Sequence, residues 1–268
     1  MKTSGYIIIL LLLCMSCAKP NLKTQEEKEL DPRLIAKDIF SIVNKERQNQ
    51  GLYKLIYDEK LADVALVHSK NMAKYGFLSH EDRERRSPQE RINMYYPEVI
   101  YGESGENIGY SQGIYKEAVA KNLMQTWMNS PDLRANILSD QYSHIGAGIA
   151  RDGSIYYGTL KFIAAVVKIH DRMIKEVEFG SEGTLKFEFA GNFDRDDLTV
   201  YCQFPDKSAR YYTFNNQFYT GIAPLTPEWI DPKTFSVTLK FDKGKGVYNF
   251  QFGRGGNFFS RGYTVVAK

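Results

Sequence analysis

The chain has 268 residues and a net charge of +3 at pH 7. Charged residues make up 25% of it and hydrophobic residues 43%, which is typical of a folded protein and argues against a disordered one. The positive charge is spread without a basic block, so nucleic acid is not expected as a partner. At this length we expect two domains.

The first 16 residues have the features of an export signal. Lys2 supplies a positive charge, residues 7–13 form an unbroken apolar run, and small residues follow. The run is too short for a permanent membrane span, which needs about 20 apolar residues. It ends at Ser16 and Cys17, an arrangement that resembles a bacterial lipoprotein signal and implies acylation of Cys17. Cys14 stands where that motif usually has leucine, and ordinary secretion is the alternative.

Residues 17–33 are polar apart from a few positions and are predicted to be a lipidated cysteine followed by a solvated tether. We therefore expect the protein at the cell envelope, anchored in a bacterial membrane through Cys17, on the periplasmic face or the cell surface. Cys202 alternates with the apolar residues of a strand pattern, so we expect a buried, inert thiol there.

Helix signals dominate the next part of the chain. Asp31 and Pro32 begin a first helix that Gly51 ends, and a second helix runs from near Asp58 to Gly76.

Further along, a capping box at residues 87–90 begins a third helix, and residues 115–128 form a fourth. Pro131 opens a short fifth. His68 lies on the apolar stripe of the second helix, where a structural histidine is the favoured interpretation.

The pattern then changes from helical to alternating, with a hairpin signal at Asp152 and Gly153. Helices followed by a hairpin indicate an α+β domain, which we assign to residues 34–171. Residues 172–268 read almost entirely as short strands separated by turn residues, which predicts a C-terminal all-β sandwich domain.

Several polar residues in the first domain are not explained by any hydrophobic pattern. They are Ser79, His80, Glu106, Asn107 and His144. Two imidazoles and a carboxylate suit either a metal site or an acid/base set, although their long spacing matches no short ligand motif. Glu106 stands in the stretch SGENIGY, which we interpret as a glycine-rich loop.

Four phrases of the sequence occur in a fixed order: the segment from VNKERQNQG to FLSH, then GENIG, then WMNSPDLRANIL, then HIGAGIA. Their order and wording resemble the CAP superfamily, the SCP/PR-1-like domains of cysteine-rich secretory, antigen 5 and pathogenesis-related proteins, and above all its bacterial branch. The resemblance covers residues 34–162. It implies an α-β-α sandwich with a broad cleft, lined in this family by two histidines and two acidic residues that hold a divalent metal in some members.

His80 and Glu106 match two of these family positions directly. At the other two, Leu133 stands where relatives usually have histidine, and His144 stands where they usually have glutamate. Because leucine cannot bind a metal, one hypothesis is a zinc site of His80, Glu106 and His144 with water as the fourth ligand. The alternative is that Glu106 accepts hydrogen bonds and holds its segment in shape. Asn107 and Tyr110 are predicted to line the same cleft.

The family has been linked to sterol or lipid binding, antimicrobial action, proteolysis and host interaction, so the fold does not choose a function. We favour a lipid-anchored binding or scaffold module, with a lipid, glycan or protein ligand in the cleft, over an enzyme. One alternative is a metal-dependent hydrolase or protease in which His80 and Glu106 are the candidate catalytic residues and His144 completes the site. The other is an adhesion or docking protein that acts through the C-terminal domain.

Overall fold

The computed structural model describes residues 31–113, 115–169, 174–213 and 215–268. The predicted signal peptide with Cys14, the lipidation site Cys17 and most of the tether lie outside the described residues. The predicted domain boundary at residue 171 does so too. No helix in the described part of the chain is long and apolar enough to cross a membrane.

The first half of the chain contains the five predicted helices and a set of strands. The helices are α1 (Pro32–Asn49), α2 (Glu59–Tyr75), α3 (Pro88–Tyr95), α4 (Lys116–Asn129) and α5 (Pro131–Leu138). The strands are β1 (Ile56–Tyr57), β2 (Val99–Gln112), β3 (His144–Asp152) and β4 (Ile155–Ile169). Local capping explains the helix boundaries. Asp31 accepts a hydrogen bond from the Arg33 amide, Ser87 and Glu90 form the predicted capping box, and Gly76 ends α2 with a φ of 64°.

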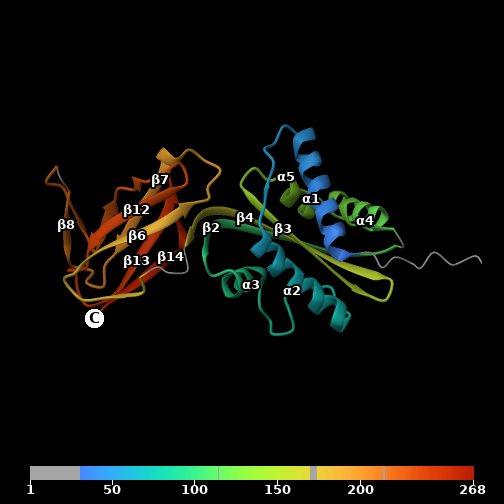
Figure 1. Ribbon diagram of the computed structural model, residues 1–268, viewed down its shortest axis with the longest axis horizontal. Coiled ribbons are helices and arrows are strands. Elements are labelled where there is room, and N and C mark those ends of the chain that lie inside the picture. Colours follow the sequence, from blue (N-terminus) through green and yellow to red (C-terminus); the bar gives the residue numbers. More distant parts are fainter. Residues whose placement is uncertain (1–30, 114, 170–173, 214) are drawn as a thin grey trace, which may run out of the picture.

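The strands of this half form one sheet with helices on both faces. β2 and β3 flank β4 as antiparallel neighbours, and β1 pairs with β3 in parallel. Helices α1, α4 and α5 cover one face, and α2 and α3 cover the other (Figure 1). The fully buried Trp127 of α4 belongs to the apolar cluster on the first face, and Ile92 of α3 belongs to the cluster on the second. The predicted α-β-α sandwich is therefore confirmed.

The segment around Glu106 is a strand, and the prediction of a loop was wrong. β2 pairs with β4 without interruption from residue 104 to residue 112, and Glu106 lies opposite Lys161. The glycines that prompted the loop prediction have a packing role instead. A side chain at Gly105 would meet the Tyr142 hydroxyl at 2.6 Å, and one at Gly109 would meet the Trp127 indole at 3.0 Å.

Two glycines of β3 allow α2 to lie directly on the sheet. A Cβ atom at Gly148 would overlap the backbone of Leu66, and one at Gly146 would overlap the backbone of Ala62. Because a backbone cannot move aside as a side chain can, only glycine fits these positions. This accounts for the HIGAGIA phrase of the sequence.

We expect Gly148→Ala to lower the free energy of unfolding by about 3 kcal/mol, because the added methyl group forces α2 away from the sheet. The matched control is Gly158→Ala in β4, where the added atom would meet the ends of flexible side chains at 3.0 and 3.1 Å. Urea unfolding of both variants measures the difference. Equal stability of Gly148→Ala and the wild type would contradict the close approach of α2.

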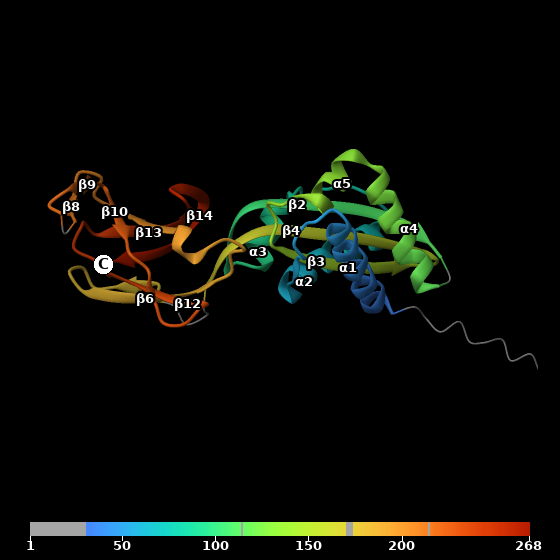
Figure 2. The ribbon, with the colours of Figure 1, turned by 90° about the horizontal axis from the view of Figure 1, so that it is seen from above.

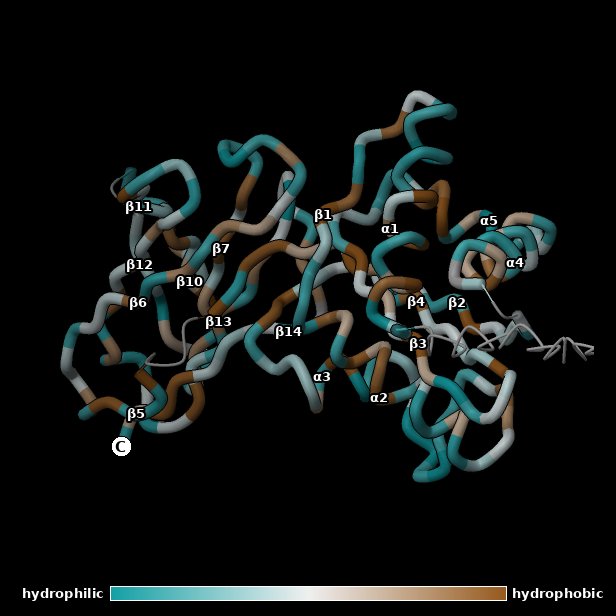
Figure 3. Tube along the Cα trace, turned by 45° about the vertical axis from the view of Figure 1, so that its right-hand side comes forward, coloured by the Kyte–Doolittle hydropathy of each residue, from teal (hydrophilic) through white to brown (hydrophobic). Residues whose placement is uncertain are grey.

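The second half is made of strands. They are β5 (Glu176–Val177), β6 (Glu182–Phe189), β7 (Leu198–Gln203), β8 (Arg210–Tyr212), β9 (Phe218–Thr220), β10 (Ile222–Leu225), β11 (Glu228–Trp229), β12 (Thr234–Lys240), β13 (Gly246–Arg254) and β14 (Asn257–Ala267). A sheet of order β10-β7-β13-β14-β5 packs on β6 and β12 across a common apolar core. Figure 3 shows hydrophobic residues recurring along the strands of both halves. Cys202 is fully buried in this core, as predicted, and burial raises the pKa of its thiol.

The two halves share one sheet. The end of β4 pairs with β6, so the sheet of the first half continues into the second through the order β1-β3-β4-β6-β12-β11 (Figure 2). Close to Ser143, the pairing of β4 with β3 ends and the pairing of β4 with β6 begins. The Ser143 Oγ atom accepts a hydrogen bond from the Ala165 amide at 2.9 Å. Ile100, Val166 and Val167 come from the first half but lie in the core of the second.

Side chains of β14 complete the contact between the halves. The Arg261 guanidinium donates to the Asn93 side chain and to the Pro97 carbonyl, both at 2.8 Å. The ring of Phe259 lies against Gly102 of β2, where a Cβ atom would overlap it. The second half is thus joined to the first by paired strands, apolar packing and hydrogen bonds.

Candidate functional site

The structure brings His80 and Glu106 together. His80 follows α2 and Glu106 lies in β2, and the His80 Nδ1 atom is 2.8 Å from Glu106 Oε1. The other carboxylate oxygen, Oε2, lies 2.8 Å from Arg91 Nη2 and 2.6 Å from Lys161 Nζ. The side chains of Glu106, Arg91 and Lys161 are almost completely buried, whereas the His80 side chain is 51% exposed. We call these four residues the Glu106 cluster.

The Glu106 cluster carries more positive than negative charge. One carboxylate faces a guanidinium and an ammonium group, both buried. Burial alone would raise the pKa of Glu106, but the hydrogen bond to His80 and the charges of Lys161 and Arg91 lower it to about 2. Burial lowers the pKa of Lys161 to about 8, against the opposing attraction of Glu106. The Glu106 carboxylate therefore forms ion pairs with both Arg91 and Lys161, and it stays ionised at any physiological pH.

The cluster also ties four parts of the chain together. Besides Glu106, the Arg91 guanidinium binds the carbonyl oxygens of His80 at 2.8 Å and Arg86 at 2.7 Å, which fixes the connection between α2 and α3. The Lys161 ammonium group donates to the Pro88 carbonyl at 3.1 Å. Strands β2 and β4, helix α3 and the α2–α3 connection thus meet at a single carboxylate.

We expect the stability contributed by Glu106 to disappear in acid. Its pKa is about 2 in the folded protein and 4.5 ordinarily, so the unfolded chain takes up the proton first as the pH falls. The contribution is complete above pH 4.5, and about 3 kcal/mol of it is lost between pH 4.5 and 2. Urea unfolding of the wild type and Glu106→Gln from pH 7 to pH 2 measures this loss as a shrinking difference. A difference that stays constant with pH would contradict the lowered pKa.

His68 and Ser79 support the segment that carries His80. The Nε2 atom of His68, which is fully buried in α2, lies 2.9 Å from the Ser79 carbonyl oxygen. Burial lowers the pKa of His68 to about 4, so it is neutral at physiological pH. The Ser79 hydroxyl accepts a hydrogen bond from the Glu81 amide. The interpretation of His68 as a structural histidine agrees with this geometry.

Asn107 lies on the other face of the sheet from Glu106, because side chains alternate along β2. Its amide donates to the Leu133 carbonyl at 2.8 Å, and its side-chain oxygen accepts from Asn136 at 2.9 Å. Asn107 is fully buried and anchors α5 to the sheet. The prediction that it lines a cleft with Glu106 is corrected accordingly.

His144 does not join the Glu106 cluster. It lies opposite Ile163 in the β3–β4 pair, whereas Glu106 lies opposite Lys161 on the far side of β4. Its Nδ1 atom is 2.8 Å from Ser143 Oγ. Only 3% of the residue is exposed, and burial lowers its pKa to about 4. The strand β4 thus separates His144 from the other two predicted ligands.

The donor set does not fit the zinc site that the sequence predicts. The Glu106 oxygens are already engaged by His80, Arg91 and Lys161, and a divalent cation at Oε2 would meet two buried positive charges. Among the described residues, no group of three or more histidine, cysteine, aspartate or glutamate side chains is arranged to hold a metal ion. His80, Glu106 and His144 do not form a three-ligand site here, and Leu133 offers only its backbone carbonyl to Asn107.

Tyr110 is the other predicted cleft residue that reaches solvent. It is 57% exposed, and its ring lies 6.3 Å from that of Tyr157. By strand alternation it shares a face with Glu106, four residues away along β2. Of the five predicted cleft residues, only His80 and Tyr110 are therefore open to a ligand.

Two members of the cluster, Arg91 and Lys161, were not predicted from the sequence. Lys161 is the only charged residue in the apolar run of β4 from residue 155 to residue 167. A lone lysine in such a run signals a buried cation, which requires a carboxylate partner. Arg91 gave no comparable signal, because an arginine in a polar helix usually faces water.

Comparisons with known proteins agree with the fold of the first half. A model of the family described as the cysteine-rich secretory protein family, CAP, matches residues 40–167. The uncharacterized protein YkwD of Bacillus subtilis is 35% identical over 127 residues, which cover 47% of this chain and 46% of that protein. The uncharacterized membrane protein YlbC of the same species is 30% identical over 145 residues, covering 54% and 39%. The matched part of the chain thus spans less than half the length of either relative.

Solved structures also match part of the chain. An extracellular protein with an SCP domain from Bacillus anthracis has 27% identity and a TM-score of 0.44, and the match covers 49% of this chain and 41% of that one. An outer surface protein of Borrelia burgdorferi has 18% identity and a TM-score of 0.44, and the match covers 50% and 95%. On the strength of the family match, the α-β-α sandwich formed by residues 40–167 is a CAP domain of the cysteine-rich secretory protein family.

Proposed function

We propose that this protein is a lipid-anchored binding or scaffold module of the bacterial cell envelope, and that its CAP domain engages a lipid, glycan or protein ligand without catalysing a reaction. The observation that carries the proposal is the state of Glu106. Its side chain is 1% exposed and bound to two buried cations, so it has no free oxygen to act as a base or to bind a metal. The cluster supports the surface above it.

The surface above the cluster has the composition of a binding site. Exposed apolar residues lie at the end of α2, in the connection that follows and at the end of α3: Tyr75, Leu78, Met94 and Tyr95. Arg83 stacks over the Tyr75 ring at 4.4 Å, and Arg86 lies 5.7 Å from the Tyr95 ring. Aromatic and methionine side chains beside arginine are enriched in the centres of binding interfaces. This combination, with the half-exposed His80, supports binding as the role of this face.

A calorimetric zinc titration separates the binding module from the alternative of a metal-dependent hydrolase. We expect no saturable site at micromolar zinc in the mature wild-type chain, and no difference between wild type and His80→Ala. A saturable site in the wild type that disappears in His80→Ala would overturn the proposal, because His80 is the exposed member of the cluster.

The anchor is tested by metabolic labelling with palmitate in a bacterial host. We expect label in the wild type and in Cys14→Ser, because the signal containing Cys14 is removed, and no label in Cys17→Ser. Label that persists in Cys17→Ser, or that never appears in the wild type, would contradict lipid anchoring at this position.

A further inference from the structure

Cationic side chains surround an open hollow between the end of α2 and the end of β3. The hollow has a volume of about 310 Å³. It is lined by Lys70, Ala73, Lys74, Ala150, Arg151 and Asp152. Its charged residues are all exposed, and three cations against one carboxylate leave a formal charge of +2. The hollow therefore attracts an anionic partner.

The lysines of the hollow are not neutralised by the protein itself. Neither Lys70 nor Lys74 forms an ion pair with a carboxylate in the described ranges. Lys74 Nζ lies 4.9 Å from the centre of the Tyr75 ring, and the exposed Arg83 guanidinium lies 4.4 Å from the same centre. A cation beside an aromatic ring keeps its charge and most of its hydrogen-bond donors. The positive surface thus extends from the hollow across Tyr75 to Arg83.

Exposed tyrosines belong to the same surface. Tyr75 is 43% exposed and Tyr110 is 57% exposed. Tyr110 lies opposite Tyr157 in the β2–β4 pair, and Tyr157 lies opposite Ala150 of the hollow in the β3–β4 pair. Residues opposite one another in paired strands share a face of the sheet, so Tyr110 lies on the face that carries the hollow.

We call this surface the α2-end patch. It consists of Lys70, Lys74, Tyr75, Arg83, Tyr110 and Arg151. Tyrosines among lysine and arginine side chains are typical of protein surfaces that lie at the headgroup level of a membrane.

The α2-end patch lies at the end of the molecule where the described chain begins. Figures 1 and 2 show the start of α1, the tip of the β3–β4 hairpin and the end of α2 at the end opposite the second half. Residues 18–30 connect the proposed lipid site Cys17 to Asp31, and a segment of this length spans at most about 45 Å. A lipid anchor at Cys17 therefore keeps the patch within reach of the bilayer.

We propose that the α2-end patch binds the anionic phospholipid headgroups of the membrane in which the protein is anchored, an inference that rests on the lipid anchor of the proposed function. Each lysine or arginine held near an anionic bilayer strengthens binding roughly fivefold, and the patch has four. The tether makes the contact intramolecular, so weak individual contacts add up to a stable one. The contact orients the molecule with its second half away from the bilayer.

Vesicle flotation tests the patch on the mature chain with Cys17→Ser, which carries no acyl group. The probes are vesicles of phosphatidylcholine alone and vesicles in which about a third of the lipid is phosphatidylglycerol. We expect at least roughly tenfold stronger binding to the anionic vesicles, and we expect added salt to weaken that binding. Equal binding to the two kinds of vesicle, or no binding to either, would overturn the proposal and leave the patch to a protein or glycan partner.

The position of the contact is tested with the triple variant Lys70→Gln/Lys74→Gln/Arg83→Gln, which we expect to weaken binding to the anionic vesicles roughly tenfold or more. The matched control, Lys186→Gln/Lys233→Gln/Lys240→Gln, removes the same charge from exposed positions of the second half, and we expect a change of about twofold or less. An equal loss in both variants would show attraction by net charge alone and would refute a defined patch.

A fluorescent label reports the orientation. Ser154 is an exposed residue next to the hairpin tip, and Thr238 is exposed in β12 of the second half. Because Cys202 is buried, a nitrobenzoxadiazole reagent labels only the new cysteine in Ser154→Cys or Thr238→Cys. We expect anionic vesicles to raise the fluorescence at residue 154 and not at residue 238, and the reverse pattern would contradict the proposed orientation. The palmitate experiment tests the anchor separately, because the vesicle experiments use a chain without one.

Discussion

Glu106→Gln lowers the free energy of unfolding by about 4 kcal/mol, because it leaves Arg91 and Lys161 buried without the carboxylate that both of them contact. A loss of this size is a large fraction of the 5 to 15 kcal/mol that stabilises an ordinary domain. Because glutamine has nearly the same volume as glutamate, the loss of stability measures the removal of the negative charge and not a change in packing. Urea unfolding at pH 7 measures it.

The matched control is Glu103→Gln, an exposed glutamate of the same strand, for which we expect a change within about 0.5 kcal/mol. If Glu106→Gln proves as mild as this control, Glu106 does not hold the cluster together. Its lowered pKa would then need another cause.

The excess of cations predicts an asymmetry within the Glu106 cluster. Lys161→Met leaves Glu106 paired with Arg91 and removes the second buried charge, so we expect it to be neutral or stabilising at pH 7. For the same reason, Lys161→Met combined with Glu106→Gln should recover part of the stability that Glu106→Gln loses. The four proteins of this cycle are the wild type, Lys161→Met, Glu106→Gln and the double variant. Their unfolding free energies give the interaction energy between Lys161 and Glu106.

Removing residues 170–268 abolishes the stable fold of the first half. Ile100, Val166 and Val167 are at most 1% exposed, and they lie in the core that the second half supplies. Exposing three aliphatic side chains costs roughly 5 to 9 kcal/mol, which equals or exceeds the stability of many domains. The deletion also strips β4 of its β6 partner. We therefore expect the two halves of the intact chain to unfold together.

The two tryptophans allow this to be measured, because Trp127 lies in α4 and Trp229 lies in β11. In Trp229→Phe the fluorescence reports the first half, and in Trp127→Phe it reports the second. In each variant we expect the fluorescence and far-ultraviolet circular dichroism transitions to coincide. Two separate transitions, or a soluble and cooperatively folded fragment of residues 18–169, would contradict the shared core.

The helices of the first half were predictable because each begins and ends with local chemistry. Asp31, Ser87 and Gly76 act over two to four residues, and such local signals can be recognised without knowledge of the fold. The strand that carries Glu106 was missed because glycines in a polar phrase are typical of a loop. In the structure they make room for Tyr142 and Trp127, which are far away along the chain.

The candidate site was predictable only in part. The family resemblance predicted that His80 and Glu106 line the same cleft. The structure places the His80 Nδ1 atom 2.8 Å from Glu106 Oε1. It could not show that alternation turns Asn107 to the opposite face, or that β4 stands between Glu106 and His144. Both follow from strand register, which a single sequence does not encode in any local pattern.

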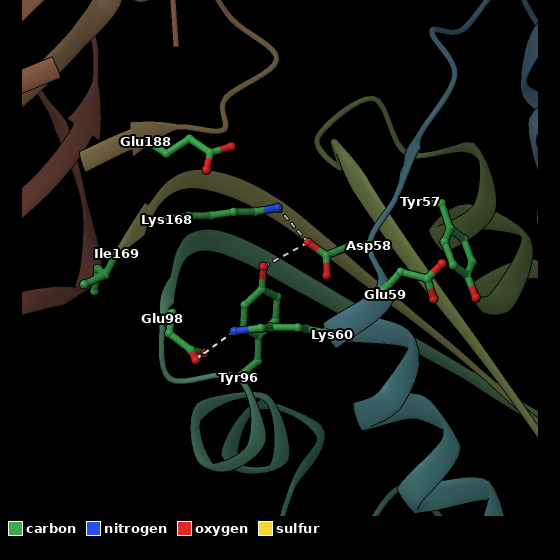
Figure 4. Close-up of a pocket in the computed structure, with 9 residues that line it drawn as sticks. All are labelled: Tyr57, Asp58, Glu59, Lys60, Tyr96, Glu98, Lys168, Ile169 and Glu188. Carbon is green, nitrogen blue, oxygen red and sulfur yellow. Dashed lines mark hydrogen bonds and ion pairs between the residues drawn. The ribbon is translucent and has the colours of Figure 1, made fainter. Parts of the chain in front are cut away.

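The shared sheet also bears on what the second half does. A C-terminal unit that only tethered or displayed the CAP domain would need no common core with it. Here β4 belongs to both halves, and a pocket between them is lined by Asp58 and Glu98 of the first half and by Glu188 of the second (Figure 4). We therefore include the second half in the proposed binding module, and a separate role in adhesion stays a hypothesis.

The central claim is that the carboxylate of Glu106 is committed to Arg91 and Lys161 and is not available to a metal. Carbon-13 NMR of the glutamate side-chain carboxyls, with Glu106 assigned through Glu106→Gln, measures its pKa directly with and without zinc. We predict a pKa of about 2 that zinc does not change. A pKa near the ordinary 4.5, or a Glu106 resonance that shifts on adding micromolar zinc, would contradict it.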